Sequence, residues 1–122
     1  MPTVELTRDN FESVVTDNPM VVVDFWAPWC GPCRGFAPVF ENASQSHPDV
    51  VFAKVNTDKE QELAGSFNIR SIPTLMVFRE KVILVQQAGA MPASALEQML
   101  SKVKLADMAE VRKEIAKRDA TA

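Results

Sequence analysis

The sequence predicts an α/β fold in which a central mixed β-sheet carries helices on both of its faces. Apolar runs rich in β-branched and aromatic residues, without the alternation of a half-exposed strand, indicate strands that are covered on both sides. Between them lie segments whose apolar residues recur every three or four positions, as in helices. The order of these elements is β-α-β-α-β-α-β-β-α. A chain of 122 residues fits one compact domain with a sizeable core.

In the first half of the chain, capping and turn residues divide the helices from the strands. A helix capped by Thr7 should end at Asn18-Pro19, because proline removes a backbone donor and restricts the residue before it. A longer helix should open at the two cysteines, run to about Ser46 and bend at Pro38. The strands of this half are expected at 4–6, 21–26 and 50–55.

The second half predicts two more strands and two more helices. The segment Asp58-Lys59-Glu60-Gln61 looks like a capping box that leads into a short helix. Strands at 74–78 and 82–85 are separated by three residues, a gap that suits a hairpin. A helix should begin near Met91-Pro92, since proline fits a first turn. Its apolar stripe consists of Leu96, Met99, Leu100 and Val103.

Composition and charge exclude several classes of function. The formal net charge is −3, which argues against a nucleic-acid surface. No apolar run approaches the roughly 20 residues that span a bilayer. The first residues show neither the basic nor the apolar segment of a signal peptide. We therefore expect a cytoplasmic protein with no nucleic-acid or membrane partner, in a compartment where a stable structural disulfide is not expected.

The only two cysteines stand in Trp29-Cys30-Gly31-Pro32-Cys33. A zinc site needs about four ligands, and the chain offers just one histidine, His47, so we expect no metal. A structural disulfide across three positions closes a tiny loop and constrains the unfolded chain little. Two thiols at a junction between a strand and a helix are also poorly placed to fill a core. A Cys-x-x-Cys pair beside a βαβ pattern favours redox exchange.

Redox exchange also explains the spacing. Cys30 falls at the start of a helix, where free N–H groups and the helix dipole favour a thiolate that can attack a disulfide. Cys33 follows one turn later on the same face and is suited to resolve the mixed disulfide. Gly31 and Pro32 allow a sharp entry into the helix with no side chain that blocks the sulfur.

Three segments of the sequence are distinctive: Val23-Asp24-Phe25-Trp26, Ala27-Pro28-Trp29-Cys30-Gly31-Pro32-Cys33-Arg34 and Arg70-Ser71-Ile72-Pro73-Thr74. Together they resemble the thioredoxin family. The resemblance runs from about Val4 to Val103, with the elements in the family's order. It implies a thioredoxin domain over 1–103 and a protein-disulfide reductase that a thioredoxin reductase recharges. It implies no bound cofactor other than the Cys30–Cys33 disulfide, because NADPH would enter only through the reductase.

The resemblance also assigns residues around the cysteines. Asp24 corresponds to the family's buried acid, which exchanges a proton with Cys33, and Lys54 to the lysine beside that acid. Otherwise Asp24 would reach solvent at a strand end, Lys54 would be a solvated strand lysine, and Trp26 would simply pack in the core. Pro73 corresponds to a cis-proline. The surface that docks protein substrates would consist of Trp29, Gly31, Pro32, Ile72, Pro73, Ala88, Gly89 and Ala90.

Two rival functions remain. An oxidase or isomerase of the same family is disfavoured, because such members usually carry histidine where Pro32 stands. A binding module with incidental thiols would reduce no substrate, so insulin reduction separates the rivals. Two local departures from the family are Ser71, where glycine is frequent, and a hairpin at 79–81 that lacks the usual glycine.

The tail, residues 104–122, lies beyond the domain that the family explains. The stripe that ends at Val103 does not continue, because positions 107, 110 and 114 are acidic. A new helix is expected over 108–118, opened by a capping box from Asp107 to Glu110, with Met108, Val111 and Ile115 on one narrow apolar face. Such a short helix should dock on its own domain, on a second copy or on a partner. Apart from such a contact, we expect a monomer.

Overall fold

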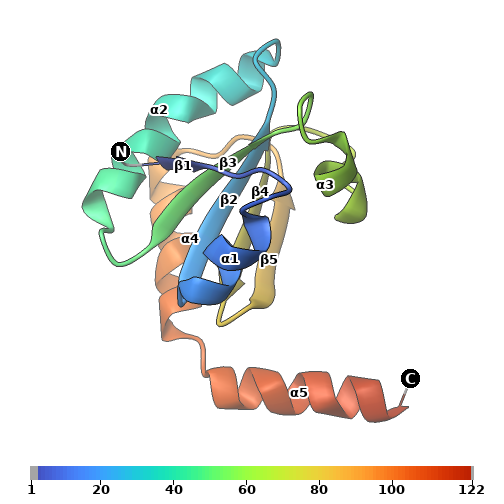
Figure 1. Cartoon of the computed structure of the whole chain (residues 1–122). Helices are drawn as coiled ribbons and strands as arrows, with labels where there is room; N and C mark the ends of the chain where they lie inside the picture. Colours follow the sequence, from blue (N-terminus) through green and yellow to red (C-terminus); the bar gives the residue numbers. More distant parts are fainter. Residues whose placement is uncertain (1–2, 122) are drawn as a thin grey trace.

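A computed structural model describes residues 3–121 and contains a five-stranded mixed sheet (Figure 1). The strand order is β1-β3-β2-β4-β5. The first three strands of that order run parallel, and β4 and β5 join antiparallel. This arrangement confirms the predicted fold class. The strands are β1 (Thr3–Glu5), β2 (Met20–Trp26), β3 (Val51–Asn56), β4 (Thr74–Arg79) and β5 (Val82–Ala88).

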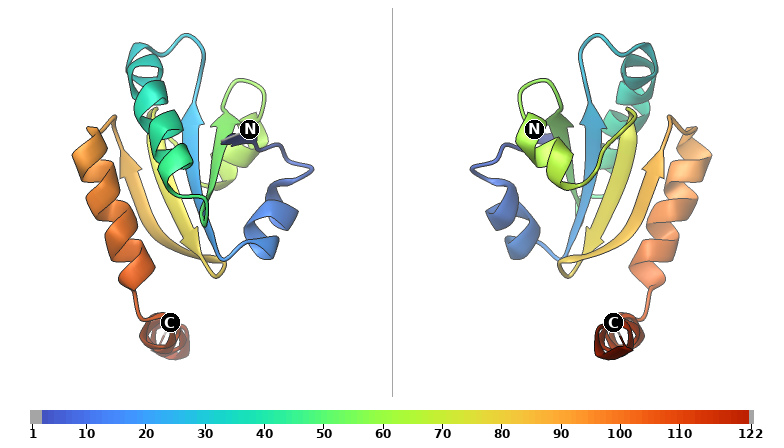
Figure 2. Two further views of the ribbon diagram at one scale, coloured as in Figure 1. Left: turned by 90° about the vertical axis from the view of Figure 1, so that its left-hand side faces the viewer. Right: turned by 90° about the vertical axis from the view of Figure 1, so that its right-hand side faces the viewer.

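Helices cover both faces of the sheet, as Figure 2 shows. The side chains of β2 alternate between the faces: Val22 joins a core cluster with α2 and α4, whereas Val21 and Val23 join a second cluster with α1 and α3. Because both faces are covered, β2 reads as a continuous apolar run. The helices are α1 (Phe11–Asp17), α2 (Gly31–Ser46), α3 (Gln61–Ser66), α4 (Ala93–Leu105) and α5 (Met108–Thr121).

Two predicted helix caps are wrong. Thr7 does not cap α1; its backbone N–H instead donates to Oδ1 of Asn10, the residue that directly precedes the helix (2.7 Å). The expected capping box at 58–61 is also not formed, and α3 begins after Glu60 without a side-chain cap. There, the side chain of Asn56 accepts the N–H of Asp58 (3.0 Å) and shapes the turn before the helix. In both places a neighbouring asparagine competes successfully for the backbone donors.

The turn between β4 and β5 has an unusual backbone for its sequence. Glu80 and Lys81 both have positive φ, 51° and 71°, as in the two-residue hairpin turn that favours glycine or asparagine. For other residues this conformation costs roughly 1 kcal/mol each. The N–H of Glu80 donates to the carbonyl of Pro19 (2.8 Å), and its carboxylate pairs with Arg112 of α5. These contacts hold the turn in place.

The tail forms the expected new helix, α5, which crosses the base of the domain and then extends away from it (Figure 1). The carboxylate of Asp107 accepts the N–H groups of Ala109 (3.0 Å) and Glu110 (3.2 Å), which is the Asp107 half of the predicted capping box, whereas the Glu110 carboxylate pairs with Lys113. At the root of the helix Met108 is buried. The guanidinium of Arg79 donates to two backbone carbonyls at the end of α4, of Val103 and Ala106. The tail thus docks on its own domain through its first turns.

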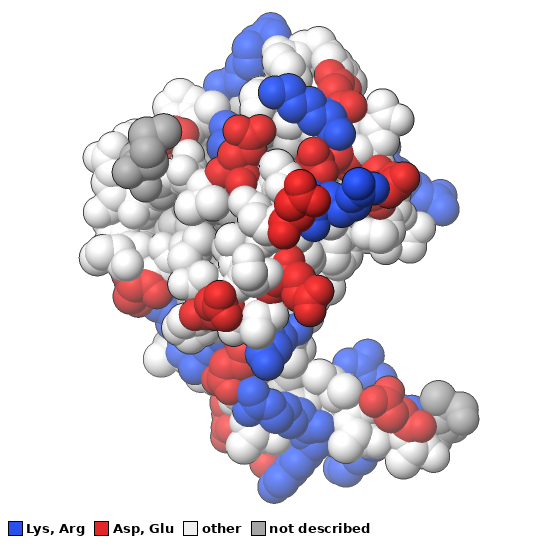
Figure 3. Space-filling model, in the orientation of Figure 1, with Lys and Arg blue, Asp and Glu red and all other residues white. Residues whose placement is uncertain are grey.

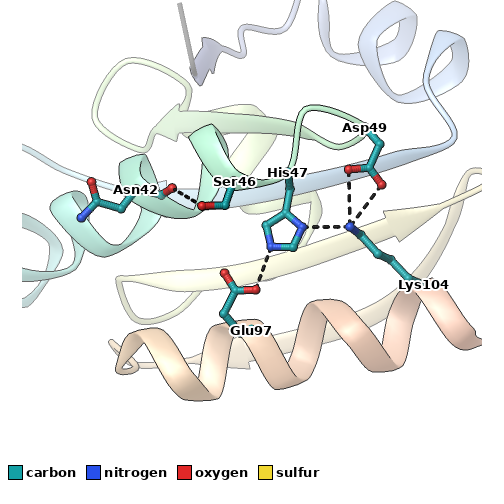
Figure 4. A network of polar contacts seen from close by, with 6 residues as sticks. All are labelled: Asn42, Ser46, His47, Asp49, Glu97 and Lys104. Carbon is teal, nitrogen blue, oxygen red and sulfur yellow. Dashed lines mark hydrogen bonds and ion pairs between the residues drawn. The ribbon is translucent and has the colours of Figure 1, made fainter.

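A polar network joins the end of α2 to α4 (Figure 4). The Nζ of Lys104 lies 2.8 Å from Nδ1 of His47 and 3.1 Å from Asp49. Because an ammonium can only donate, Nδ1 accepts, and Nε2 of His47 donates to Glu97 over 2.7 Å. The hydrogen bond from Lys104 lowers the pKa of Asp49. His47 therefore serves as a link between helices, and no three His, Cys, Asp or Glu side chains within residues 3–121 are grouped to hold a metal ion.

The exposed charges are mixed in sign. Figure 3 shows acidic and basic side chains interspersed over the face in view, rather than one broad basic surface. Among residues 3–121, no helix combines the length and apolar character needed to cross a membrane.

Candidate active site

Cys30 and Cys33 form a disulfide at the start of α2. Cys30 has an extended backbone and is the residue directly before the helix, and its sulfur accepts the N–H of Cys33 over 3.2 Å. Gly31 and Pro32 occupy the first two helical positions, where the missing N–H of proline costs nothing. The sulfur of Cys30 is therefore the group that meets the free N–H donors of this helix end.

The segments that carry the predicted site residues meet at one end of the sheet. Because β2 and β5 run in the same direction and β4 opposes both, the ends of β2 and β5 lie beside the start of β4. The peptide bond between Ile72 and Pro73 is cis, and the carbonyl oxygen of Ile72 lies 3.7 Å from the sulfur of Cys30. The N–H of Gly89 donates to the carbonyl of Pro73 (2.8 Å). The fold thus gathers three segments that are distant in the sequence.

The surface at this end is largely open. Trp29 is 66% exposed, and Ile72 is half-buried. Pro73 is buried, and its carbonyl accepts the N–H of Gly89. The other residues assigned to this surface are exposed, and they are Gly31, Pro32, Ala88, Gly89 and Ala90.

Asp58 belongs to the same end of the molecule and was missed as a candidate residue. Its carboxylate accepts the indole N–H of Trp29, with distances of 3.0 and 3.2 Å to the two oxygens. The contact holds the exposed ring of Trp29 beside the disulfide. In the sequence, Asp58 is indistinguishable from a helix-capping aspartate, because its partner lies 29 positions away.

Asp24 is completely buried, which excludes the alternative that it reaches solvent at a strand end. Neither carboxylate oxygen has a hydrogen-bond partner among the described residues. Burial raises the pKa of Asp24 from 3.8 to about 7, and the positive charge of Lys54 acts in the opposite direction. Lys54 is paired with Asp24 in the β2–β3 register and is half-buried. Its Nζ lies 4.6 Å from the ring centroid of Trp26, within the range of a cation–π contact.

Comparison with known proteins decides the family. The thioredoxin family model matches residues 2–102. The chain belongs to the thioredoxin family. Among its relatives is the putative thioredoxin 2 of Streptomyces coelicolor, 52% identical over 98% of this chain and 90% of the relative. The thioredoxin of Bacillus subtilis is 39% identical over 84% of this chain and 98% of its own length. A solved thioredoxin structure from Plasmodium falciparum, 37% identical, superposes with a TM-score of 0.76 over 82% of this chain and 98% of its own.

This thioredoxin is a thiol–disulfide oxidoreductase, a protein-disulfide reductase that works by dithiol–disulfide exchange. Its redox group is the disulfide between Cys30 and Cys33. The match to the Streptomyces protein spans nearly the whole chain. The match to the Bacillus protein covers 103 residues, which is almost the full length of that relative. The tail is therefore an addition that one relative shares and another does not.

Proposed function

We propose that Cys30 is the attacking sulfur and Cys33 the resolving sulfur in the reduction of disulfides in other proteins. The observation that carries this assignment is the 3.2 Å contact between the Cys30 sulfur and the N–H of Cys33 at the start of α2. A thiolate at Cys30 would receive that N–H bond and the favourable helix dipole. Cys33 sits inside the first turn with less freedom to meet a substrate, which suits the second step.

The reaction then proceeds in two displacements. The Cys30 thiolate attacks one sulfur of the substrate disulfide; a mixed disulfide forms, and the other substrate sulfur leaves as a thiolate. Cys33 loses its proton and attacks the sulfur of Cys30, which breaks the mixed disulfide and releases the second substrate thiolate. Two electrons pass to the substrate, both released thiolates gain protons, and Cys30 and Cys33 end as the disulfide.

Asp24 is the proposed acceptor of the Cys33 proton. A group with a pKa near 7 can both take and return a proton at neutral pH, and burial gives Asp24 such a pKa. Lys54 tunes this acid by its charge and reaches it from the neighbouring strand.

The proposed docking surface for protein substrates surrounds Cys30. Apolar side chains at Trp29 and Ile72 offer contact area, and the backbone beside the cis-proline Pro73 offers hydrogen bonds to an extended substrate segment. The exposed loop at 88–90 completes this surface through its bond to Pro73. The other proposed members, Gly31 and Pro32, leave the approach to sulfur open.

A thioredoxin reductase is the proposed source of electrons, with NADPH as its own reductant, and the cytoplasm is the proposed location. The support is chemical: a reductant must reach the same disulfide that substrates regenerate, and a reducing compartment keeps the dithiol available. The chain itself would hold no other cofactor.

The test is insulin reduction by the full chain with a thioredoxin reductase and NADPH. Cys30→Ser should abolish turnover, whereas Cys33→Ser should trap substrate as a mixed disulfide through Cys30. Both variants replace one cysteine by serine, at different positions, so each serves as the control for the other. Equal trapping by both variants would reverse or erase the assignment of the two sulfurs, and no turnover by the wild type would leave a binding module.

A further inference from the structure

Helix α4 runs beside β5 at the edge of the sheet (Figure 2). An apolar groove lies between these two elements. It has a volume of about 520 Å³. Leu84 and Val85 form its strand side, and Ala95, Met99 and Val103 form its helix side. The same residues are the half-covered margin of the core under α2 and α4, apart from Val103, which is buried. A concave, mostly apolar groove of this volume is the kind of surface that binds apolar groups of another molecule.

One end of the groove lies next to the loop 88–90. Gln87 and Met91 line it, and these residues flank the loop 88–90, whose Gly89 is bonded to Pro73. A substrate whose disulfide sits at Cys30 therefore has the groove directly beyond this loop. The helix side from Ala95 to Val103 spans nine residues, about 12 Å from first to last, which is the reach of about four residues of extended chain.

The side chains that line the groove can adapt to partners of different apolar sequence. Two methionines, Met91 and Met99, contribute flexible and polarizable side chains, which can adapt to different apolar partners. Lys102 is the one charged side chain in the lining, so the groove does not select an opposite charge along its length. β5 is also an edge strand, because it pairs with β4 alone among the described strands.

We propose that this groove is a second docking site for protein substrates and that it holds an apolar segment flanking the substrate disulfide. The proposal rests on the proposed placement of substrate at Cys30. It makes the groove a determinant of specificity: proteins with apolar residues near the disulfide react faster than small disulfides of equal reactivity. Small disulfides do not reach the groove and are indifferent to it.

The test compares two matched variants of the full chain in the pre-reduced form. Ala95→Glu places a charged side chain in the groove, and Ala109→Glu makes the same change in the first turn of α5, outside it. The second-order rate constants are measured with insulin and with oxidised lipoamide. Ala95→Glu should slow insulin reduction about tenfold, since an interface contact is worth about one factor of ten, and leave lipoamide unchanged. Ala109→Glu should change neither rate.

Methyl NMR tests the occupant directly. The Cys33→Ser protein is joined through Cys30 to one of two peptides, identical except that leucine or serine flanks the cysteine. The methyl signals of Met91 and Met99 should shift with the leucine peptide and much less with the serine peptide. Met20 and Met76, which are buried elsewhere, should not respond.

Several results would overturn the inference. An equal loss of both rates in Ala95→Glu, or no loss with insulin, would show that the groove does not contact substrate while the exchange function stands. A wild-type protein that forms a dimer and becomes monomeric with Ala95→Glu would show that a second copy fills the groove. A wild-type protein that reduces lipoamide but not insulin would refute the proposed function, and the inference with it.

Discussion

Replacement of Asp24 by asparagine should stabilise this thioredoxin, and the gain in unfolding free energy should grow as pH rises from about 4 to about 7. The unfolded chain ionises Asp24 near its ordinary pKa of 3.8, whereas burial keeps the folded carboxyl protonated up to a pKa of about 7. Between these values the unfolded state releases a proton that the folded state retains, so the wild type loses stability as pH rises. The gap is about three pKa units, and each is worth about 1.4 kcal/mol.

The expected difference in unfolding free energy between Asp24→Asn and the wild type is therefore near its minimum at pH 4. It grows toward neutral pH and levels off at about 4 kcal/mol above pH 7. This is a large fraction of the 5–15 kcal/mol that holds a typical domain together. Urea unfolding of the oxidised proteins from pH 4 to pH 9 measures it. Asp9→Asn, at an exposed position, controls for the loss of one carboxylate.

A constant difference between the curves over this pH range would contradict the reasoning, because it would mean that Asp24 ionises equally in both states. A variant that is less stable than the wild type at every pH would show that the carboxylate makes bonds that the structure does not contain. The same variant should resolve mixed disulfides more slowly, since Cys33 loses its proton acceptor.

Three further outcomes are expected. Lys54→Met removes the charge that lowers the pKa of Asp24, so the folded carboxyl should stay protonated to a pH above 7. In the same urea titration, the difference in unfolding free energy between Lys54→Met with Asp24→Asn and Lys54→Met alone should therefore level off at a higher pH than it does in the wild-type background. Lys81→Gly should raise the unfolding free energy by about 1 kcal/mol in urea, because glycine accepts the φ of 71° without strain; a loss of stability would mean that the Lys81 side chain packs. Truncation after Asp107 should cost about 1–3 kcal/mol through the lost burial of Met108, and leave insulin reduction unchanged. A truncated protein that folds but cannot reduce insulin would place the tail in the active site.

The parts of the fold that the sequence predicts are those decided by local burial. A strand covered on both faces must be apolar along its whole length, and this pattern locates β2 and β4. Asp24 stands out because it interrupts such a run. What the local pattern could not decide is which polar side chain captures a given donor. Thr7 and Asn10 both suit a helix start, and in the structure Asn10 directly precedes α1 while its side chain accepts the N–H of Thr7.

The candidate site divides in the same way. The cysteines and the cis-proline carry their chemistry in residue type and spacing, so the sequence suffices to find them. Asp58 carries a carboxylate that could cap a helix, and only the fold brings Trp29 to it. The groove beside α4 is harder still to foresee, because the half-covered residues Leu84 and Met99 have the same apolar periodicity as fully buried ones. The sequence does not show whether a given apolar side chain is fully covered by other residues or left partly exposed.

The turn at Glu80 and the tail, two departures from the family in the sequence, are one feature in the structure. A glycine would fit the positive φ of Glu80 without strain, but it would offer no carboxylate to Arg112. That ion pair is partly exposed and contributes about 1 kcal/mol at most, which offsets no more than the backbone cost at Glu80 alone. The burial of Met108 must then supply the net docking energy of α5, while the two bonds from Arg79 fix the end of α4 from which it departs. The ion pair fixes the direction of α5 rather than its attachment.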